Sequence, residues 1–257
     1  MPKVAVVGLG EAGALYARGL RDSGFEVSGY DPYTKLDEAG IVQHERLENA
    51  LAEVELVITL VGATAAQGVT EAVLAHLKPG AMIADLNTGG PELKRRLGAA
   101  AAERGVRFVD VAVLAPVPRA GVRTPLMASG AGADEFADLF AATGAPVESI
   151  GGEPGDAAAR KLIRSVFMKG LAAAVLESFG AAEVAGCAPW LREQVAAELA
   201  GDPHALIDRL IDGSRAHAAR RVHEVTDARD YLESIDQPTW TMQAARSWLS
   251  SLDRANV

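Results

Sequence analysis

The chain has 257 residues, of which 49% are hydrophobic and 23% are charged, and its formal net charge at pH 7 is −9. This length allows one large domain or two modest ones, and the composition is that of a globular protein with a buried core. The net negative charge excludes a general nucleic-acid-binding surface, which requires a basic face, so we expect no nucleic-acid partner.

Features of secretion, membrane insertion and metal binding are missing from the sequence. Cys187 is the single cysteine, so no intrachain disulfide can form, and it has no neighbours at the spacing of metal ligands. The N-terminus enters an apolar strand at once, without the charged and apolar regions of a signal peptide. No apolar run approaches the ~20 residues that span a bilayer. These features predict a cytoplasmic protein without a metal site or a membrane partner.

Residues 3–13, KVAVVGLGEAG, predict a strand, a glycine-rich turn and a helix in direct succession. The β-branched run at 3–7 is typical of a parallel strand buried on both faces. In the G-x-G-x-x-G pattern, the first glycine allows a tight turn, the second lets the backbone approach a pyrophosphate, and the third lets the helix pack closely on the strand. The helix N-terminus favours the negative phosphates. We therefore expect dinucleotide contacts from Gly8, Leu9, Gly10, Glu11, Ala12 and Gly13.

Asp31 follows a second predicted strand, residues 25–30, and lies 23 residues after Gly8. This distance is close to the ~20 residues expected for the acid that binds the adenosine ribose. A carboxylate there repels a 2′-phosphate, so NAD is the expected cofactor, while the nearby Lys35 leaves NADP possible. The alternative is an ordinary strand–turn–helix unit that binds no cofactor.

Five further strands and four helices are expected in the first part of the chain. The strands are predicted at 56–61, 81–86, 106–114, 126–129 and 146–150, and the helices at 48–53, 64–76, 91–104 and 134–143. The segment 32–47 is polar and turn-rich, and no strand is predicted in it. Because the carboxyl ends of parallel strands line the cofactor crevice of an open sheet, we expect cofactor contacts from Val61, Gly62 and Thr64.

The second part of the chain shows only helical patterns. Helices are predicted at 157–185, 190–199, 203–211, 216–234 and 239–252. The first would be about 43 Å long at 1.5 Å per residue, which is too long to lie beside one small sheet. We therefore predict an α/β fold with a Rossmann dinucleotide-binding domain at 1–151 and an all-helical domain at 152–257. The long, alanine-rich helix has more surface than one small domain can cover, so we also expect a homodimer formed through the helical domains.

Four stretches connect the chain with a known family: GLGEAG at 8–13, DLNTGGP at 85–91, the DVAV strand with its loop at 110–126, and GDAAARKLIRS at 155–165. With them the chain resembles the β-hydroxyacid dehydrogenases, which include 6-phosphogluconate and 3-hydroxyisobutyrate dehydrogenases. It looks most similar to a phosphogluconate-dehydrogenase-like branch that has its own C-terminal helical domain. The resemblance implies an NAD(P)-dependent oxidoreductase that exchanges a hydride between the nicotinamide and a CH–OH group of a small hydroxy acid or related alcohol.

The resemblance also implies roles for individual residues. Lys161 falls on the family's general acid/base, and Ser165 on the position of its asparagine. A lysine whose pKa is lowered by burial or by a positive neighbour can take the proton from an alcohol. Asn87 and Thr88 would lie near the nicotinamide. The alternative is that Lys161, Arg164 and Lys169 are cations that extend from a packed helix to water.

The substrate contacts are expected to differ from those of the family. Where the family has Ser-Gly-Gly as a carboxylate anchor, this sequence has Leu114, Ala115 and Pro116. Arginine offers a planar fork to an anion, so the proline-rich loop could replace the anchor and bind a small anionic substrate. We expect substrate contacts from Pro116, Arg119, Arg123, Thr124, Arg164, Lys169 and His223. The alternative for the loop is a solvated segment without a ligand.

Two other functions fit parts of the pattern. An imine reductase-like enzyme is the nearest enzymatic alternative, although such relatives generally lack a lysine at the position of Lys161. A non-catalytic NAD(P)-binding redox sensor or scaffold would explain the loss of Ser-Gly-Gly and of the asparagine. Such a protein would have no need of the lysine.

Overall fold

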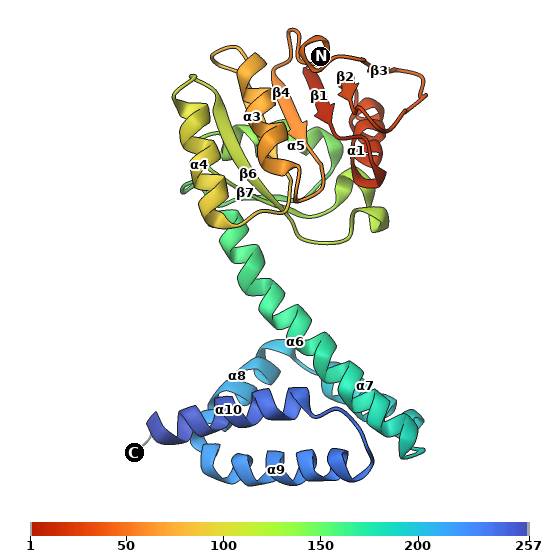
Figure 1. Ribbon diagram of the computed structural model, residues 1–257, viewed down its shortest axis with the longest axis vertical. Helices are drawn as coiled ribbons and strands as arrows, with labels where there is room; N and C mark the ends of the chain where they lie inside the picture. The colour runs from red at the N-terminus through yellow and green to blue at the C-terminus, as the bar shows by residue number, and fades with distance from the viewer. Residues whose placement is uncertain (1, 256–257) are drawn as a thin grey trace. The chain divides into compact units, whose positions relative to one another are not determined.

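The structure is a computed structural model in which residues 2–255 are described (Figure 1). The chain divides into two compact units, residues 1–164 and 165–257. The predicted boundary at 151–152 precedes the long helix α6 (Asp156–Val184), whereas the units divide within this helix. The reason is that the first turns of α6 are hydrogen-bonded to side chains of the sheet in the first unit.

One eight-stranded sheet organises the first unit. Its strands are β1 (Lys3–Val7), β2 (Glu26–Tyr30), β3 (Ile41–Gln43), β4 (Leu56–Thr59), β5 (Met82–Asp85), β6 (Arg107–Val113), β7 (Leu126–Ser129) and β8 (Val147–Ser149). They lie in the order β3-β2-β1-β4-β5-β6-β7-β8, and β6 and β7 form the antiparallel pair while the other neighbours are parallel. The first six follow the Rossmann order, whose switch point lies between β1 and β4.

Helices cover both faces of this sheet, as Figure 1 shows. They are α1 (Glu11–Asp22), α2 (Leu47–Ala50), α3 (Ala66–His76), α4 (Pro91–Ala102) and α5 (Ala133–Phe140). Because side chains alternate along a strand, Val4 and Val6 join the core under α1 and α5, whereas Ala5 and Val7 join the core under α3 and α4. The central strand β1 is therefore buried on both faces, as its apolar sequence predicts.

The second unit is helical throughout its described part. It contains the end of α6 and the helices α7 (Ala188–Leu199), α8 (Pro203–Ala216), α9 (Ala218–Ser234) and α10 (Trp240–Ala255), and α9 lies beside α10 (Figure 1). The predicted break at 211 is absent, since α8 continues to Ala216 and His217 separates it from α9. Among residues 2–255, no helix has the length and apolar character needed to cross a membrane.

The predicted α/β class with a helical C-terminal region is confirmed, and one strand was missed. β3 consists of three residues at the edge of the sheet inside the segment predicted to be a turn. Its residue Ile41 is buried and Val42 is 61% exposed. Such a short edge strand shows too little alternation to be recognised from the sequence.

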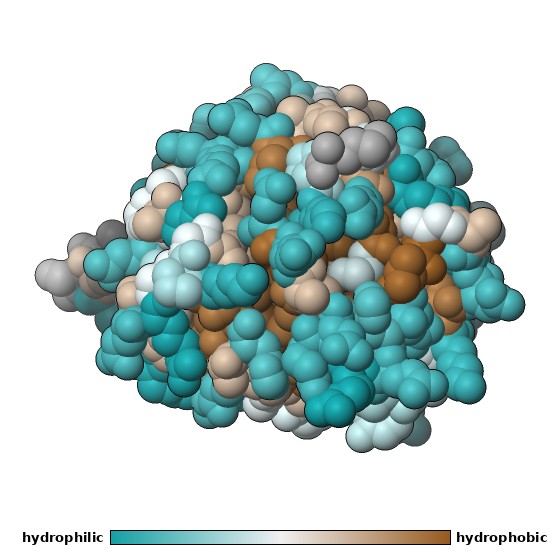
Figure 2. Space-filling model, turned by 90° about the horizontal axis from the view of Figure 1, so that it is seen from above, coloured by the Kyte–Doolittle hydropathy of each residue, from teal (hydrophilic) through white to brown (hydrophobic). Residues whose placement is uncertain are grey.

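The surface agrees with the charged composition of the chain. Seen from above the view of Figure 1, the molecule is mostly hydrophilic, with apolar residues in patches between polar ones (Figure 2). Large apolar side chains are nevertheless exposed along α6, including Val166 at 76%, Phe167 at 61% and Leu176 at 75%. Exposed apolar surface that continues along one helix is typical of an interaction site.

Candidate functional site

The three glycines of the first turn have different geometric constraints. Gly8 has a φ of +95°, and a Cβ there would lie 2.2 Å from the carbonyl oxygen of Leu60. A Cβ on Gly13 would lie 1.8 Å from the carbonyl oxygen of Gly8, so only glycine lets α1 pack this closely on the turn. A Cβ on Gly10, by contrast, would meet nothing within 4 Å. The turn therefore needs Gly8 and Gly13 for its own packing, while the space beside Gly10 is open.

A cleft of about 610 Å³ lies in front of this turn. Its volume is within the range of ligand sites in proteins. Eight of the predicted cofactor-binding residues line it: Gly8, Gly10, Glu11, Ala12, Gly13, Asp31, Val61 and Gly62. The other four, Leu9, Thr64, Asn87 and Thr88, do not border the cleft. Leu9 is 1% exposed and belongs to the core, and Thr64 is exposed beyond the end of β4.

Asp31 connects the glycine turn with the loop after β2. One carboxylate oxygen, Oδ2, accepts the amide N–H of Leu9 at 2.8 Å. The other, Oδ1, accepts the amides of Tyr33 at 2.8 Å and Thr34 at 2.9 Å. A carboxylate has about four lone-pair sites, so the partly exposed Asp31 can still accept a bond from a hydroxyl group. Leu9 thus contributes its backbone amide, which fixes the orientation of the Asp31 carboxylate.

Tyr33 was not among the site residues predicted from the sequence. Its side chain is 95% exposed although its backbone is held by Asp31, and it lines the cleft together with Pro32. Val69 and Ala72 of α3 also line the cleft. An exposed ring near apolar walls is suited to stacking on a planar base. The signal in the sequence was an aromatic residue two positions after the predicted ribose-binding acid.

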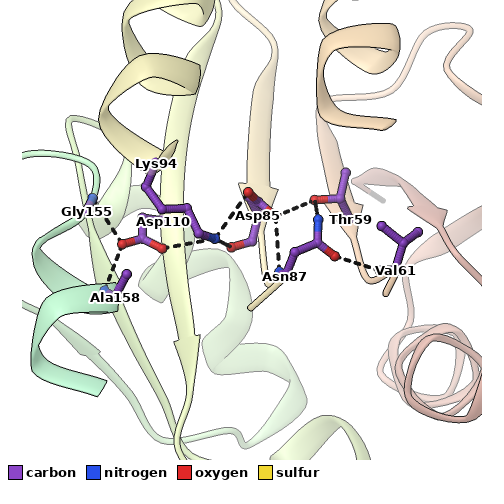
Figure 3. Close-up of polar contacts among 8 residues, drawn as sticks. All are labelled: Thr59, Val61, Asp85, Asn87, Lys94, Asp110, Gly155 and Ala158. Atoms are coloured by element: carbon purple, nitrogen blue, oxygen red, sulfur yellow. Dashed lines mark hydrogen bonds and ion pairs between the residues drawn. The ribbon is translucent and has the colours of Figure 1, made fainter. Parts of the chain in front are cut away.

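A line of buried polar groups begins at the rim of the cleft (Figure 3). The Oδ1 of Asn87 accepts the amide of Val61 at 2.6 Å, and its Nδ2 donates to the hydroxyl of Thr59 at 3.1 Å. Asp85 Oδ1 accepts bonds from the Thr59 hydroxyl at 2.9 Å and from the Asn87 amide at 3.0 Å. Asn87 is 4% exposed, and the neighbouring Thr88 is exposed. The predicted residue Asn87 thus fixes the backbone at the cleft.

The line continues to the start of α6 through a buried ion pair (Figure 3). Lys94 Nζ lies 3.1 Å from Asp85 Oδ2 and 3.2 Å from Asp110 Oδ1. Asp110 Oδ2 accepts the amides of Gly155 at 3.1 Å and Ala158 at 2.9 Å. These three charged residues were not singled out from the sequence. Lys94, for example, stands in the polar helical pattern PELKRRL.

Lys161 lies on α6 one turn beyond the amides held by the sheet. Its side chain is partly exposed. Burial lowers the pKa of Lys161 below its usual value, and the positive charge of Lys94 lowers it further, while Asp110 acts in the opposite direction. A lowered pKa increases the fraction of neutral amine, which is the form that accepts a proton. Ser165 follows one turn later on the same helix.

The proline-rich loop has a regular fold and packs on the core. It forms two 3₁₀ turns, Val117–Arg119 and Gly121–Arg123, whose residues Val117 and Val122 are buried in the core. Gly19 of α1 makes room for the loop, since a Cβ there would lie 2.4 Å from Val122. Pro116, Arg119 and Arg123 are among the exposed residues of the loop. The loop therefore packs on the core and exposes two arginine side chains.

Thr124 requires a correction. Its side chain is 0% exposed, and its hydroxyl group donates to the carbonyl oxygen of Gly121 at 2.7 Å. The expectation of a substrate contact was wrong for this residue, because the hydroxyl is buried and stabilises the turn. Arg164 is exposed at the end of the first unit, and Lys169 and His223 are exposed on α6 and α9 of the second unit. The roles of these three remain predictions.

Within residues 2–255, no group of three or more His, Cys, Asp or Glu residues is placed to hold a metal ion. The glycine turn, the acid after β2 and the cleft between them instead define a dinucleotide-binding domain.

Comparison with known proteins identifies the family. Residues 3–151 match the family model described as the NAD binding domain of 6-phosphogluconate dehydrogenase, and residues 182–252 match a domain of unknown function. The first match covers more than half of the chain, so the protein belongs to this family of NAD-binding oxidoreductases. The predicted resemblance and the predicted NAD(P)-type cofactor are thereby confirmed.

Three proteins illustrate the similarity. A conserved hypothetical protein from Sinorhizobium meliloti 1021 is 30% identical, with a TM-score of 0.65, over 97% of this chain and 88% of that chain. An NAD-dependent L-serine dehydrogenase from Pseudomonas aeruginosa is 29% identical over 121 residues, which are 44% of this chain and 41% of that protein. An imine reductase from Bacillus cereus BAG3X2 is 19% identical, with a TM-score of 0.83, over 99% of this chain and 94% of that chain. The last shows a shared fold.

Proposed function

We propose that the protein is an NAD(P)-dependent dehydrogenase that acts on the CH–OH group of a small anionic hydroxy acid or related alcohol, with Lys161 as general acid/base. The observation that carries this proposal is the position of Lys161. It stands one turn from an amide that Asp110 holds, and burial and Lys94 both lower its pKa. A lysine whose pKa is lowered in this way is suited to accept and return a proton.

The residues of the cleft suit a dinucleotide. The backbone at Gly10 is open, and the N-terminus of α1 behind it favours a pyrophosphate. Asp31 would accept a ribose hydroxyl, and Tyr33 would stack on the adenine. Val61 and Asn87 would border the nicotinamide, which supplies the hydride-accepting group. We propose NAD as the preferred form, because a carboxylate at position 31 repels a 2′-phosphate.

Lys161 and Ser165 would handle the substrate hydroxyl. In the oxidation, the neutral amine of Lys161 takes the hydroxyl proton, and in the reduction the ammonium group returns it. Ser165 follows on the same helix face and would hydrogen-bond the substrate oxygen. Arg119 and Arg123 belong to a loop that packs on the core, and their planar guanidinium groups would bind an anionic group of the substrate. With Pro116 and Arg164, they are the proposed substrate contacts of the first unit, and the contacts expected from Lys169 and His223 in the second unit stay predictions.

The fold of the imine reductase from Bacillus cereus supports a second candidate, reduction of an imine. Lys161 argues against it, because imine reductases generally lack a lysine at this position. A third candidate is a redox sensor that binds NAD(P) without turnover. The loss of the family's Ser-Gly-Gly supports this reading, while the pKa of Lys161 argues for catalysis.

A substrate screen separates the three candidates. NAD and NADP reduction would be followed with hydroxy acids, sugar acids and phosphorylated or sulfonated alcohols, and NADPH and NADH oxidation with cyclic imines. The proposal predicts turnover with an anionic alcohol. Turnover with imines alone would favour the second candidate, and tight cofactor binding without any turnover would favour the sensor.

We also propose that the protein is a homodimer formed through its helical unit. The exposed apolar side chains along α6 support this, since they include Val166, Phe167 and Leu176. A monomer in sedimentation experiments at micromolar concentration and above would contradict the proposal.

A further inference from the structure

Lys94 is a buried charge for which the proposed reaction has no direct use. Its side chain is 2% exposed, and its Nζ lies 2.9 Å from the carbonyl oxygen of Asp85, 3.1 Å from Asp85 Oδ2 and 3.2 Å from Asp110 Oδ1. An ammonium group has three donors, and three oxygens surround this one. Buried lysines are uncommon unless they are paired, so this contact set indicates a specific role.

The two carboxylates extend from Lys94 in opposite directions, as Figure 3 shows. Asp85 leads to Thr59 and Asn87, and Asn87 holds the backbone of Val61 at the cofactor cleft. Asp110 leads to the amides of Gly155 and Ala158 at the start of α6. Ala157 is held in the same way by the hydroxyl of Ser129. Through these two carboxylates, Lys94 therefore connects the residues at the cofactor cleft with the first turn of α6, the helix that carries Lys161.

We propose that Lys94 is a positioning residue of the catalytic centre, whose ammonium group keeps Asp110 against α6 and sets the charge environment of Lys161.

A neutral side chain could not perform this role. Without the ammonium group, the buried carboxylates of Asp85 and Asp110 would face each other unpaired, and such groups separate or take up protons. Asp110 accepts two amides of α6 through one oxygen while its other oxygen faces Lys94. Movement of this carboxylate would change the position of the first turn of α6. Lys161 lies one turn further along and would move with it.

The charge of Lys94 also acts on Lys161 directly. The groups that influence Lys161 from packed elements are Lys94 on α4, which lowers its pKa, and Asp110 on β6, which raises it. Arg160 and Arg164 on the same helix are exposed, so solvent screens them. We therefore expect removal of the positive charge at position 94 to raise the pKa of Lys161 and to decrease the fraction of neutral amine at a given pH.

The catalytic meaning of this inference rests on the proposed role of Lys161, but its test does not need turnover. The reactivity of Lys161 with acetic anhydride would be measured against pH by competitive labelling, with peptide mass spectrometry as the readout. The variants are Lys94→Met, Asp110→Asn and the double variant Lys94→Met/Asp110→Asn. Arg96→Met, an exposed cation on the same helix α4, is the control.

Lys94→Met should shift the labelling midpoint of Lys161 to higher pH, and Arg96→Met should leave it in place. Asp110→Asn should shift it to lower pH, because a negative neighbour is lost. If Lys94→Met fails to fold, the double variant and Asp110→Asn still differ in the charge at position 94 alone, and both keep an amide oxygen for α6. The midpoint of the double variant should then lie above that of Asp110→Asn. Equal midpoints in either comparison would overturn the proposal.

The pH profile of kcat/KM for the oxidation separates this inference from the proposed function. If both hold, the profile of Lys94→Met moves to higher pH together with the labelling midpoint. If the midpoint moves while the profile stays in place, Lys94 acts on Lys161 as proposed but Lys161 is not the general base.

Discussion

Asp110, in the middle of strand β6, accepts the backbone amide of Ala158 in the first turn of α6 at 2.9 Å. The same carboxylate lies 3.2 Å from the ammonium group of Lys94. A helix N-terminus has amide groups without partners inside the helix, and here side chains of the sheet accept them. The position of Lys161 thus depends on a carboxylate that lies far from it in the sequence.

Asp110→Ala should destabilise the protein by about 3–5 kcal/mol, because it leaves Lys94 with one carboxylate fewer and two buried amides without acceptors. Urea unfolding measures this loss. Asp156→Ala is the matched control at the same helix start, where the side chain is 42% exposed, and it should cost less than about 1 kcal/mol. Equal losses for the two variants would mean that the buried contact is unimportant.

Gly10→Ala and Gly13→Ala should separate binding from stability. The open space at Gly10 accepts a methyl group, so the fold should keep its melting temperature while the methyl group hinders the cofactor and raises its Kd. At Gly13 the added Cβ would lie 1.8 Å from the carbonyl oxygen of Gly8, so the melting temperature should fall. Calorimetric scans and NAD titrations test both. A stable Gly13→Ala variant would show that α1 can move away from the turn.

Asp31 should make NAD bind more tightly than NADP, because its carboxylate repels a 2′-phosphate. Asp31→Asn keeps one oxygen for the amides of Tyr33 and Thr34 and loses the bond from the amide of Leu9, which Asp31 accepts through its other oxygen. A buried donor left without its acceptor costs about 1–3 kcal/mol, which is less than the usual stability of about 5–15 kcal/mol. The fold should therefore survive while the ratio of the two Kd values moves toward NADP. Isothermal titration of both cofactors measures the ratio, and tighter NADP binding by the wild type would refute the assignment.

Tyr33→Ala should weaken binding of NAD and of ADP-ribose by a similar factor. Stacking of a base on an aromatic ring contributes about 1–3 kcal/mol, which corresponds to a factor of roughly 5–150. Nicotinamide mononucleotide lacks the adenine, so its affinity should be unchanged. A loss of affinity for nicotinamide mononucleotide as well would place Tyr33 elsewhere in the site.

The glycine turn and the cleft in front of it were largely predictable from the sequence, because their contacts are local. The glycine turn and Asp31 follow directly from two strands whose apolar runs are easy to recognise. The short edge strand β3 was not predicted, since three residues show almost no periodicity. Strand β4 also ends at Thr59, two residues earlier than predicted, which lets Val61 leave the sheet and border the cleft.

The polar line around Lys94 was not predictable in the same way. The residues that contact one another there belong to β5, β6 and α6. They lie far apart in the sequence, so their contacts cannot be recognised from it. Lys94 looks like an ordinary helix-surface lysine until the packing of α4 on the sheet buries it. The substrate contact predicted for Thr124 was wrong for the opposite reason. Its hydroxyl group belongs to a loop and looked available to a ligand, but it stabilises the turn by donating to the carbonyl oxygen of Gly121.

The central claim is that Lys161 transfers the proton, and steady-state kinetics of Lys161→Ala test it most directly. Removal of a positioned general acid/base costs about 10²–10⁴ in rate, while the proposed cofactor contacts at Gly10 and Asp31 are untouched. We predict a loss of kcat of this size on the substrate found in the screen, with an unchanged Kd for NAD and a normal kcat for the exposed neighbour variant Arg160→Ala. A Lys161→Ala variant with near wild-type kcat would contradict the account.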